Sequence, residues 1–155
     1  MTDEFKERMA QDHGDIDINF SIMVLAANFW PLNAPDSGFN IPTDILPLYD
    51  RFSKYYRTKH SGRKLVWLWE HSKSELRTNY LNREYIFMTS SYQMAVLLQY
   101  NDRNTLTLDE LVAATAINKD VLMQDLELLV NAGVLINKEK DRYDLNLGNL
   151  FPSSL

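Results

Sequence analysis

The stretch HSGRKLVWLWEHSKSEL, residues 60–76, places the end of a helical pattern directly before the start of a strand pattern. Gly62 lies between the two patterns. Because glycine readily adopts the left-handed backbone conformation in which many helices end, it predicts a helix terminus here. From Lys64 to Trp69 apolar residues fall on both alternating faces, which predicts a strand covered on two sides. The stretch is therefore predicted to join a helix to a sheet.

The helix before this joint has the clearest pattern in the chain. Its apolar positions recur at spacings of three and four residues, which predicts an amphipathic helix from Asp44 to His60. We expect Asp44 to be the N-cap, and Pro47 is tolerated in the first turn. The apolar positions are Ile45, Leu48, Tyr49, Phe52, Tyr55 and Tyr56. A shorter, polar helix is predicted for residues 2–11.

Three further segments have strand patterns. Residues 18–27 are mostly apolar on both faces, and residues 74–80 and 85–89 flank a polar turn. Together with Lys64 to Trp69 they predict a small sheet of four strands, packed by the helix from Asp44 to His60. Trp67 and Trp69 would lie on one face of that sheet with Leu65. We interpret them as core anchors, with contact to a partner as the alternative.

The last third of the chain predicts three short helices followed by a hairpin. Ser90 with Gln93, and Thr107 with Glu110, form capping boxes, and Asn118 caps a third helix that ends at Gly133. Two strand patterns then flank a polar turn. This order is typical of a winged helix. The predicted fold is α+β, with a small mixed α/β sheet domain followed by a winged-helix domain.

The composition indicates a globular chain without a membrane span. Of its 155 residues, 45% are hydrophobic and none is cysteine, which favours a reducing compartment. The longest apolar runs are far shorter than the roughly 20 residues that a membrane-spanning helix needs, and the first residues lack a signal-peptide pattern. We expect no membrane partner.

The charge is unevenly distributed. Residues 51–64 hold six Lys or Arg and no acid, whereas residues 91–155 hold five basic and nine acidic residues. The basic segment is interpreted as a solvated helix face or as a dock for an acidic partner, with Arg57, Lys59, Arg63 and Lys64 as its members. The third helix of the predicted winged helix has one Lys against three acids, which disfavours DNA binding because phosphate contacts need basic residues.

No catalytic motif stands out. His13, His60 and His71 are dispersed, and the sequence has neither HExxH nor a glycine-rich phosphate loop. Glu70 and Glu75 are interpreted as exposed acids at strand ends rather than as a catalytic pair. We therefore expect no enzyme activity, no cofactor and no metal site.

The sequence resembles the cullin family, in particular the SCF-type scaffold cullins. The resemblance covers nearly the whole chain and is densest in the stretches His60–Leu65, Trp67–Leu68, Ser72–Lys73, Glu75–Leu76, Thr78–Asn79, Gln93–Met94 and Leu97–Asn101. It implies three parts. Residues 1–17 would be the end of a four-helix-bundle helix, residues 18–90 the cullin α/β domain, and residues 91–155 a winged-helix domain.

The resemblance implies a non-catalytic scaffold of a ubiquitin ligase in the cytoplasm and nucleus. Its sheet would accept a strand from a RING-box protein, which recruits a ubiquitin-conjugating enzyme, while no nucleic acid is bound directly. The docking residues implied are Phe20, Ile22, Val24, Ala26, Leu65, Trp67 and Trp69. The family's second winged helix and its modifier-carrying lysine have no counterpart in this sequence. The alternatives are a nucleic-acid-binding winged-helix protein and a cullin-like subunit of another large ubiquitin ligase.

Overall fold

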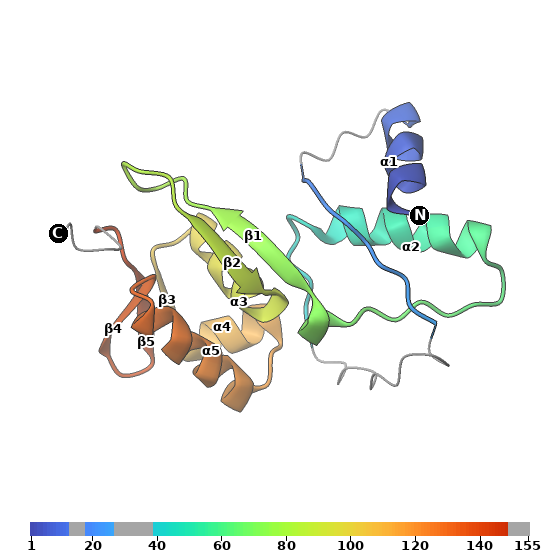
Figure 1. Cartoon of the computed structure of the whole chain (residues 1–155). Helices are drawn as coiled ribbons and strands as arrows, with labels where there is room; N and C mark the ends of the chain where they lie inside the picture. Colours follow the sequence, from blue (N-terminus) through green and yellow to red (C-terminus); the bar gives the residue numbers. More distant parts are fainter. Residues whose placement is uncertain (13–17, 27–38, 149–155) are drawn as a thin grey trace. The chain divides into compact units, whose positions relative to one another are not determined.

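The computed structural model describes residues 1–12, 18–26 and 39–148 (Figure 1). The chain divides into two compact units, which are described separately. Unit 1 comprises Met1–Ala34 and Thr43–Trp67, and unit 2 comprises Pro35–Pro42 and Leu68–Leu155. The described residues form five α-helices and two small antiparallel sheets. The predicted α+β class is therefore confirmed.

Unit 1 is built on two helices, α1 (Thr2–Gln11) and α2 (Leu46–Lys59). Both were expected from the apolar spacing. Their buried side chains form one aromatic-rich cluster, which consists of Phe5, Leu48, Phe52, Tyr55 and Tyr56. The N-cap of α2 is Ile45 and not Asp44, and no side chain caps this end. The predicted break at Gly62 is confirmed, since this residue has a φ of +80°.

The four-stranded sheet predicted from the sequence does not form. Residues 18–26 and 63–68 contain no strand. Six of their half-buried side chains pack against the aromatic cluster of unit 1, namely Ile18, Phe20, Ile22, Val24, Leu65 and Trp67. Apolar alternation predicts an extended backbone, but a strand also needs a neighbour that completes its hydrogen bonds. The expectation that both faces of residues 18–27 are covered is also wrong, because Met23 is 81% exposed. Ala27 lies outside the described residues.

The first two strands of unit 2, β1 (Lys73–Arg77) and β2 (Ile86–Ser90), form an antiparallel hairpin in which Leu76 lies opposite Phe87. These strands confirm the two downstream strand predictions, although β1 is shorter than predicted and β2 is shifted by one residue. Of the four strands predicted for the mixed sheet, only these two form and pair with each other, so the sheet is a two-stranded hairpin. Helix α3 (Ser91–Leu98) follows directly, and the Ser90 capping box that predicted its start is formed.

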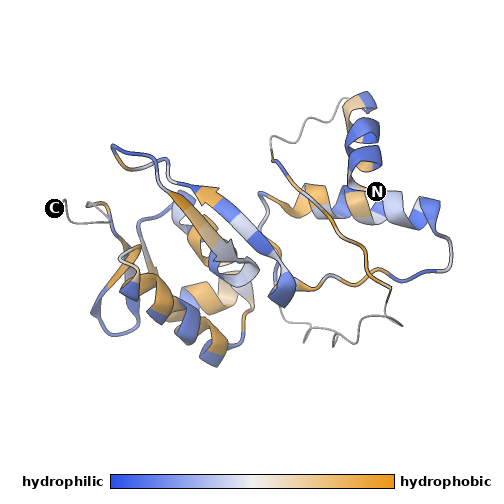
Figure 2. Cartoon of the chain, in the orientation of Figure 1, coloured by the Kyte–Doolittle hydropathy of each residue, from blue (hydrophilic) through white to orange (hydrophobic). Residues whose placement is uncertain are grey.

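The rest of unit 2 contains α4 (Leu108–Thr115), α5 (Lys119–Asn131) and a three-stranded sheet. The strands are β3 (Thr105–Thr107), β4 (Leu135–Glu139) and β5 (Arg142–Leu145), in the order β3-β5-β4. The predicted three helices and hairpin are present, whereas β3 was not predicted. Figure 2 shows apolar and polar residues interleaved along α5, and its apolar side contributes to the core.

Candidate functional site

The extended segment 18–26 is held against the helices of unit 1 by alternate side chains. Ile18, Phe20, Ile22 and Val24 are half-buried and pack on the aromatic cluster. The rings of Phe20 and Phe5 are 5.7 Å apart, and the ammonium group of Lys6 lies 5.2 Å from the centre of the Phe20 ring. The segment thus has one packed face, and Met23 and Ala26 belong to its exposed residues.

One hydrogen-bonding residue fixes the middle of this segment. The Thr2 hydroxyl donates to the Ile22 carbonyl oxygen at 2.8 Å and accepts from the Ile22 N–H at 3.0 Å. Within the part of the chain that the structure describes, no other backbone group of residues 18–26 has a hydrogen-bond partner. No sequence signal predicted this contact, because Thr2 lies 20 residues upstream of its partner.

The alternation of backbone N–H and C=O groups in an extended chain indicates which residues of the segment point away from Thr2. In such a chain the N–H and C=O of one residue point to the same side, and those of the next residue point to the opposite side. Ile22 directs both groups toward Thr2 of α1. Ser21 and Met23 therefore direct theirs to the edge away from Thr2. That edge is a row of polar backbone groups able to pair with an added strand.

Leu65 and Trp67 also belong to unit 1. Trp67 packs on α2, with ring centroids 4.6 Å from Tyr49 and 5.7 Å from Phe52. Leu65 is half-buried against the same aromatic cluster. The prediction that Trp67 anchors the core against this helix is confirmed.

Trp69 does not join Trp67 on one face, as the predicted strand required. It lies in unit 2, in a short 3-10 turn formed by Trp69–His71. Its side chain is buried, and its ring lies 5.2 Å from that of Phe39. The chain turns after Leu68 instead of continuing as a strand, so the alternation that placed both tryptophans on one face ends there.

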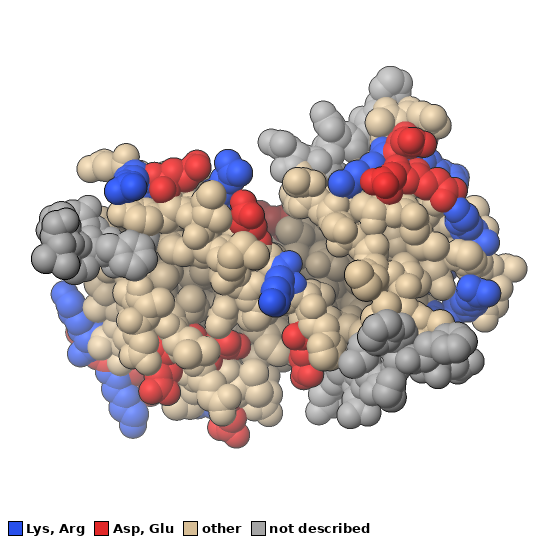
Figure 3. Space-filling model, in the orientation of Figure 1, with Lys and Arg blue, Asp and Glu red and all other residues tan. Residues whose placement is uncertain are grey.

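One member of the predicted basic patch, Lys59, forms an ion pair with an acidic residue of α1. The Lys59 ammonium group bonds the Glu4 carboxylate of α1, and this contact is the main cause that lowers the pKa of Glu4 and raises the pKa of Lys59. Arg57, Arg63 and Lys64 are exposed and form no ion pair among the described residues. Figure 3 shows mixed charges on the face drawn, without a large area of one sign.

The helix that would read DNA in a winged helix remains unsuited to that role. On α5, Lys119 is exposed next to the acidic Asp120, and the acidic Glu127 is also exposed. Burial raises the pKa of Asp125, whose carboxylate accepts a hydrogen bond from Gln93 at 3.2 Å. In the β4–β5 hairpin, Arg142 is already paired with Glu139 and Asp144.

The histidines and acids considered from the sequence are divided between the two units, with His60 in unit 1 and Glu70, His71 and Glu75 in unit 2. The His60 ring lies 4.8 Å from the Tyr56 ring and is tilted against it, and His71 is exposed at the 3-10 turn of unit 2. Glu70 and Glu75 are exposed as expected. His13 lies outside the described residues. Among residues 1–12, 18–26 and 39–148, no group of three or more His, Cys, Asp or Glu side chains could hold a metal ion. No helix in these ranges is long and apolar enough to cross a membrane.

Comparison with known proteins gives a consistent result. Residues 24–152 match the family model described as "Cullin alpha+beta domain". The chain is 38% identical over 145 residues to Cullin-1 of Schizosaccharomyces pombe, covering 92% of this chain and 19% of that protein. It is also 38% identical over 140 residues to Cullin-1 of Dictyostelium discoideum, covering 88% and 18% of the two chains.

A third relative is cell division control protein 53 of Saccharomyces cerevisiae, which is 34% identical over 97 residues. That match covers 61% of this chain and 12% of the relative. The chain thus spans about a fifth or less of the length of the curated relatives that it matches. The resemblance inferred from the sequence is confirmed.

Proposed function

Because the chain belongs to the cullin family, we propose that it acts within the scaffold of a cullin-RING ubiquitin ligase and docks a RING-box protein by strand addition. Cullins are non-catalytic scaffolds of ubiquitin ligases. A scaffold requires surfaces that hold partners rather than a nucleophile or a general base. In this proposal the RING-box protein in turn recruits a ubiquitin-conjugating enzyme.

The observation that carries the proposal is the open edge of residues 18–26. Its backbone is extended and, apart from Ile22, lacks hydrogen-bond partners among the described residues. Strand addition uses main-chain hydrogen bonds for affinity and side-chain pockets for specificity. A partner strand would pair with the backbone of Ser21, Met23 and Leu25, since those residues direct their polar groups away from Thr2.

The predicted docking residues take different roles in this proposal. Phe20, Ile22 and Val24 pack the segment against the aromatic cluster of unit 1. Leu65 and Trp67 pack against the same cluster and would support the segment indirectly. Ala26 is exposed, at the end of the described part of the segment. Trp69 is left out of the docking set because it is buried against Phe39 in the other unit.

A finer assignment concerns unit 2. We interpret α3, α4 and α5 with the β4–β5 hairpin as a winged helix that serves the scaffold rather than nucleic acid. The support is the acidic character of α5, where Asp120 and Glu127 are exposed. A helix of this charge would repel phosphate groups instead of neutralising them.

The test is co-purification with a RING-box protein after substitution of Met23. Met23→Pro removes the backbone N–H from the open edge and should abolish co-purification, because proline cannot donate to a strand ladder. Met23→Ala keeps that N–H and is the matched control, which should still co-purify. Retention of the partner by Met23→Pro, with the circular dichroism spectrum unchanged, would contradict docking along this edge.

A further inference from the structure

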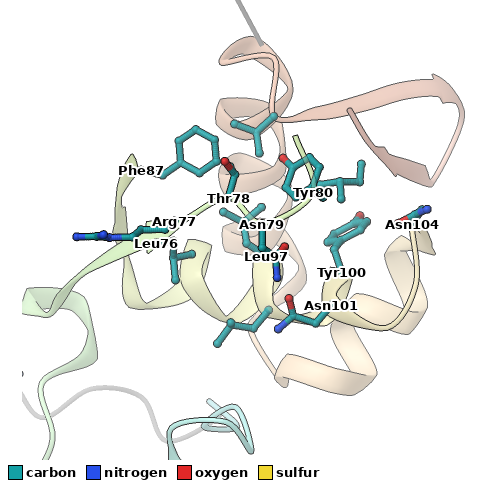
Figure 4. Close-up of a pocket in the computed structure, with 13 residues that line it drawn as sticks. Leu76, Arg77, Thr78, Asn79, Tyr80, Phe87, Leu97, Tyr100, Asn101 and Asn104 are labelled. Carbon is teal, nitrogen blue, oxygen red and sulfur yellow. The ribbon is translucent and has the colours of Figure 1, made fainter. Parts of the chain in front are cut away.

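The β1–β2 hairpin of unit 2 is a two-stranded sheet, so each of its strands has one edge without a neighbouring strand among the described residues. Its inner face carries Leu76 and Phe87, which line a pocket together with Leu97 of α3 (Figure 4). Packing on α3 supports this face of the hairpin, whereas the two strand edges have no such support. Edges of this kind are the places at which further strands add to a sheet.

The register of the hairpin shows which backbone groups point outward. The Thr78 N–H donates to the Tyr85 carbonyl oxygen at 3.0 Å, so these two residues form a hydrogen-bonded pair. Along an antiparallel ladder such pairs alternate with pairs whose N–H and C=O groups point away from the partner strand. By this alternation, Ile86 and Met88 of β2 direct their backbone groups to the open edge. Those groups have no hydrogen-bond partner among the described residues.

The side chains at the two edges differ in character. β1 exposes Lys73, Glu75 and Arg77, and charged side chains of this kind discourage strand addition. β2 contains no charged residue, and its Ile86 and Met88 side chains are 52% and 69% exposed. Exposed apolar side chains along an unpaired edge mark a site of association. The β2 edge is therefore the one suited to another strand.

The sequence of β2 is complementary to itself. When two copies lie antiparallel with Phe87 opposite Phe87, Ile86 of each copy lies opposite Met88 of the other, and each such pair exchanges two main-chain hydrogen bonds. The Ile86 and Met88 side chains then form apolar cross-strand pairs, and no like charges meet. A register shifted by one residue, centred on Met88, would need the Ser90 N–H, which already donates to the Gln93 side chain at 3.2 Å.

We propose that the β2 edge binds a second copy of this chain and forms a weak symmetric dimer with a continuous four-stranded sheet. The pairing closes on itself, because both copies use the same edge and the edges that remain belong to the charged β1 strands. β2 has only five residues, so the contact is small and depends on concentration. This surface is separate from the strand addition proposed above, which uses residues 18–26 of unit 1.

The experiment measures the mass of the 155-residue chain by analytical ultracentrifugation at concentrations up to about 1 mM, the dissociation constant of a weak complex. The average mass is expected to rise toward that of two chains and not beyond. Met88→Lys places a charge opposite Ile86 of the other copy and should weaken dimerisation roughly tenfold, because both symmetry-related pairs change. Met123→Lys makes the same change at an exposed residue of α5 and is the matched control, which should dimerise as before.

NMR of a mixed sample identifies the contact. One batch of the chain carries labelled Ile methyl groups and the other labelled Met methyl groups, so cross-relaxation between Ile86 and Met88 arises only between copies. That signal is expected in the unsubstituted chain and supports the dimer even if Met88→Lys does not fold. Self-association without this signal would overturn the proposal.

The mass measurement has further outcomes that would contradict the dimer. A monomer at every concentration would overturn it and leave the β2 edge to a strand from another protein. Growth beyond two chains would also overturn it, because head-to-tail pairing of β1 with β2 does not close. Undiminished association of a folded Met88→Lys chain would show that a different surface is used.

Discussion

A single hydroxyl group, Thr2 Oγ1, holds both backbone polar atoms of Ile22, at 2.8 Å from the carbonyl oxygen and 3.0 Å from the nitrogen. The contact ties the first turn of α1 to the extended segment 18–26. It also distinguishes the two edges of the segment, because one edge is bonded to Thr2 and the opposite edge has no backbone hydrogen-bond partner among the described residues.

Thr2→Val should release this segment while preserving side-chain volume. We expect a loss of about 1 kcal/mol in the free energy of unfolding, because two hydrogen bonds are removed from a half-exposed site. Amide hydrogen exchange at Ile22 should accelerate, and Thr2→Ser should restore the slow rate. Equal exchange rates in the Val and Ser variants would show that the hydroxyl does not hold the segment.

Tyr100 and Tyr80 of unit 2 should respond differently to loss of the hydroxyl. Tyr100→Phe removes the donor to the Tyr143 carbonyl and should cost about 1 kcal/mol of unfolding free energy. Tyr80→Phe removes a buried hydroxyl that has no hydrogen-bond partner among the described residues, and should leave stability unchanged or raise it. Chemical denaturation of the two variants provides the comparison. A clear loss in Tyr80→Phe would mean that its hydroxyl is bonded in solution.

Some of the fold could be predicted because the signals are local. The capping boxes at Ser90 and Thr107 place a hydroxyl and an amide or carboxylate three residues apart, and both helices begin there. Strand β3 was missed because its three residues give too short a pattern. Its pairing with β5 depends on a segment more than 30 residues away.

The candidate site was predicted only in part, since side-chain alternation does not reveal hydrogen-bond partners. The alternation in residues 18–26 correctly indicated extended chain, but the strand neighbours that we expected do not pair with it. Trp67 and Trp69 follow a period of two, yet the 3-10 turn at Trp69 separates them into different units. Contacts such as Thr2 with Ile22 arise from tertiary packing and have no local signature.

Asp125 should lower the free energy of unfolding as pH rises, whereas most carboxylates in folded proteins raise it. Burial raises its pKa above the ordinary value of 3.8, so the folded state binds the proton more tightly than the unfolded state does. Ionisation therefore destabilises the fold, and this penalty is present above the folded pKa and absent at low pH. Asp125→Asn should be relatively more stable at pH 7, by an amount that falls toward zero below about pH 4.

The measurement for Asp125 is the difference in unfolding free energy between the two proteins as a function of pH. Taking the difference cancels the other carboxylates, including Glu4 and Glu110, whose lowered pKa values give the opposite slope. The amide oxygen introduced by Asp125→Asn can still accept the hydrogen bond from Gln93. A difference that stays constant between pH 3 and pH 7 would contradict the raised pKa.

The exposed part of the basic patch should affect the rate of association with an acidic partner rather than the fold. Reversal of Arg63 and Lys64 to Glu changes two exposed charges that have no ion pair among the described residues. Surface charges mainly steer diffusional encounter, so the association rate of an acidic conjugating enzyme with an assembled ligase should fall at low salt. Screening should remove most of the difference near 1 M salt, where the Debye length is about 3 Å.

Lys59 belongs to the same patch but differs from Arg63 and Lys64, because its ammonium group is paired with the Glu4 carboxylate. Lys59→Ala should alter the contact between α1 and α2 and have a smaller effect on association than the reversal of Arg63 and Lys64. Rapid-mixing association rates at several salt concentrations, combined with thermal unfolding of each variant, separate the two effects. If reversal of Arg63 and Lys64 left the association rate unchanged at every ionic strength, these residues would form only a solvated surface, and steering of an acidic partner would have to be assigned to other residues.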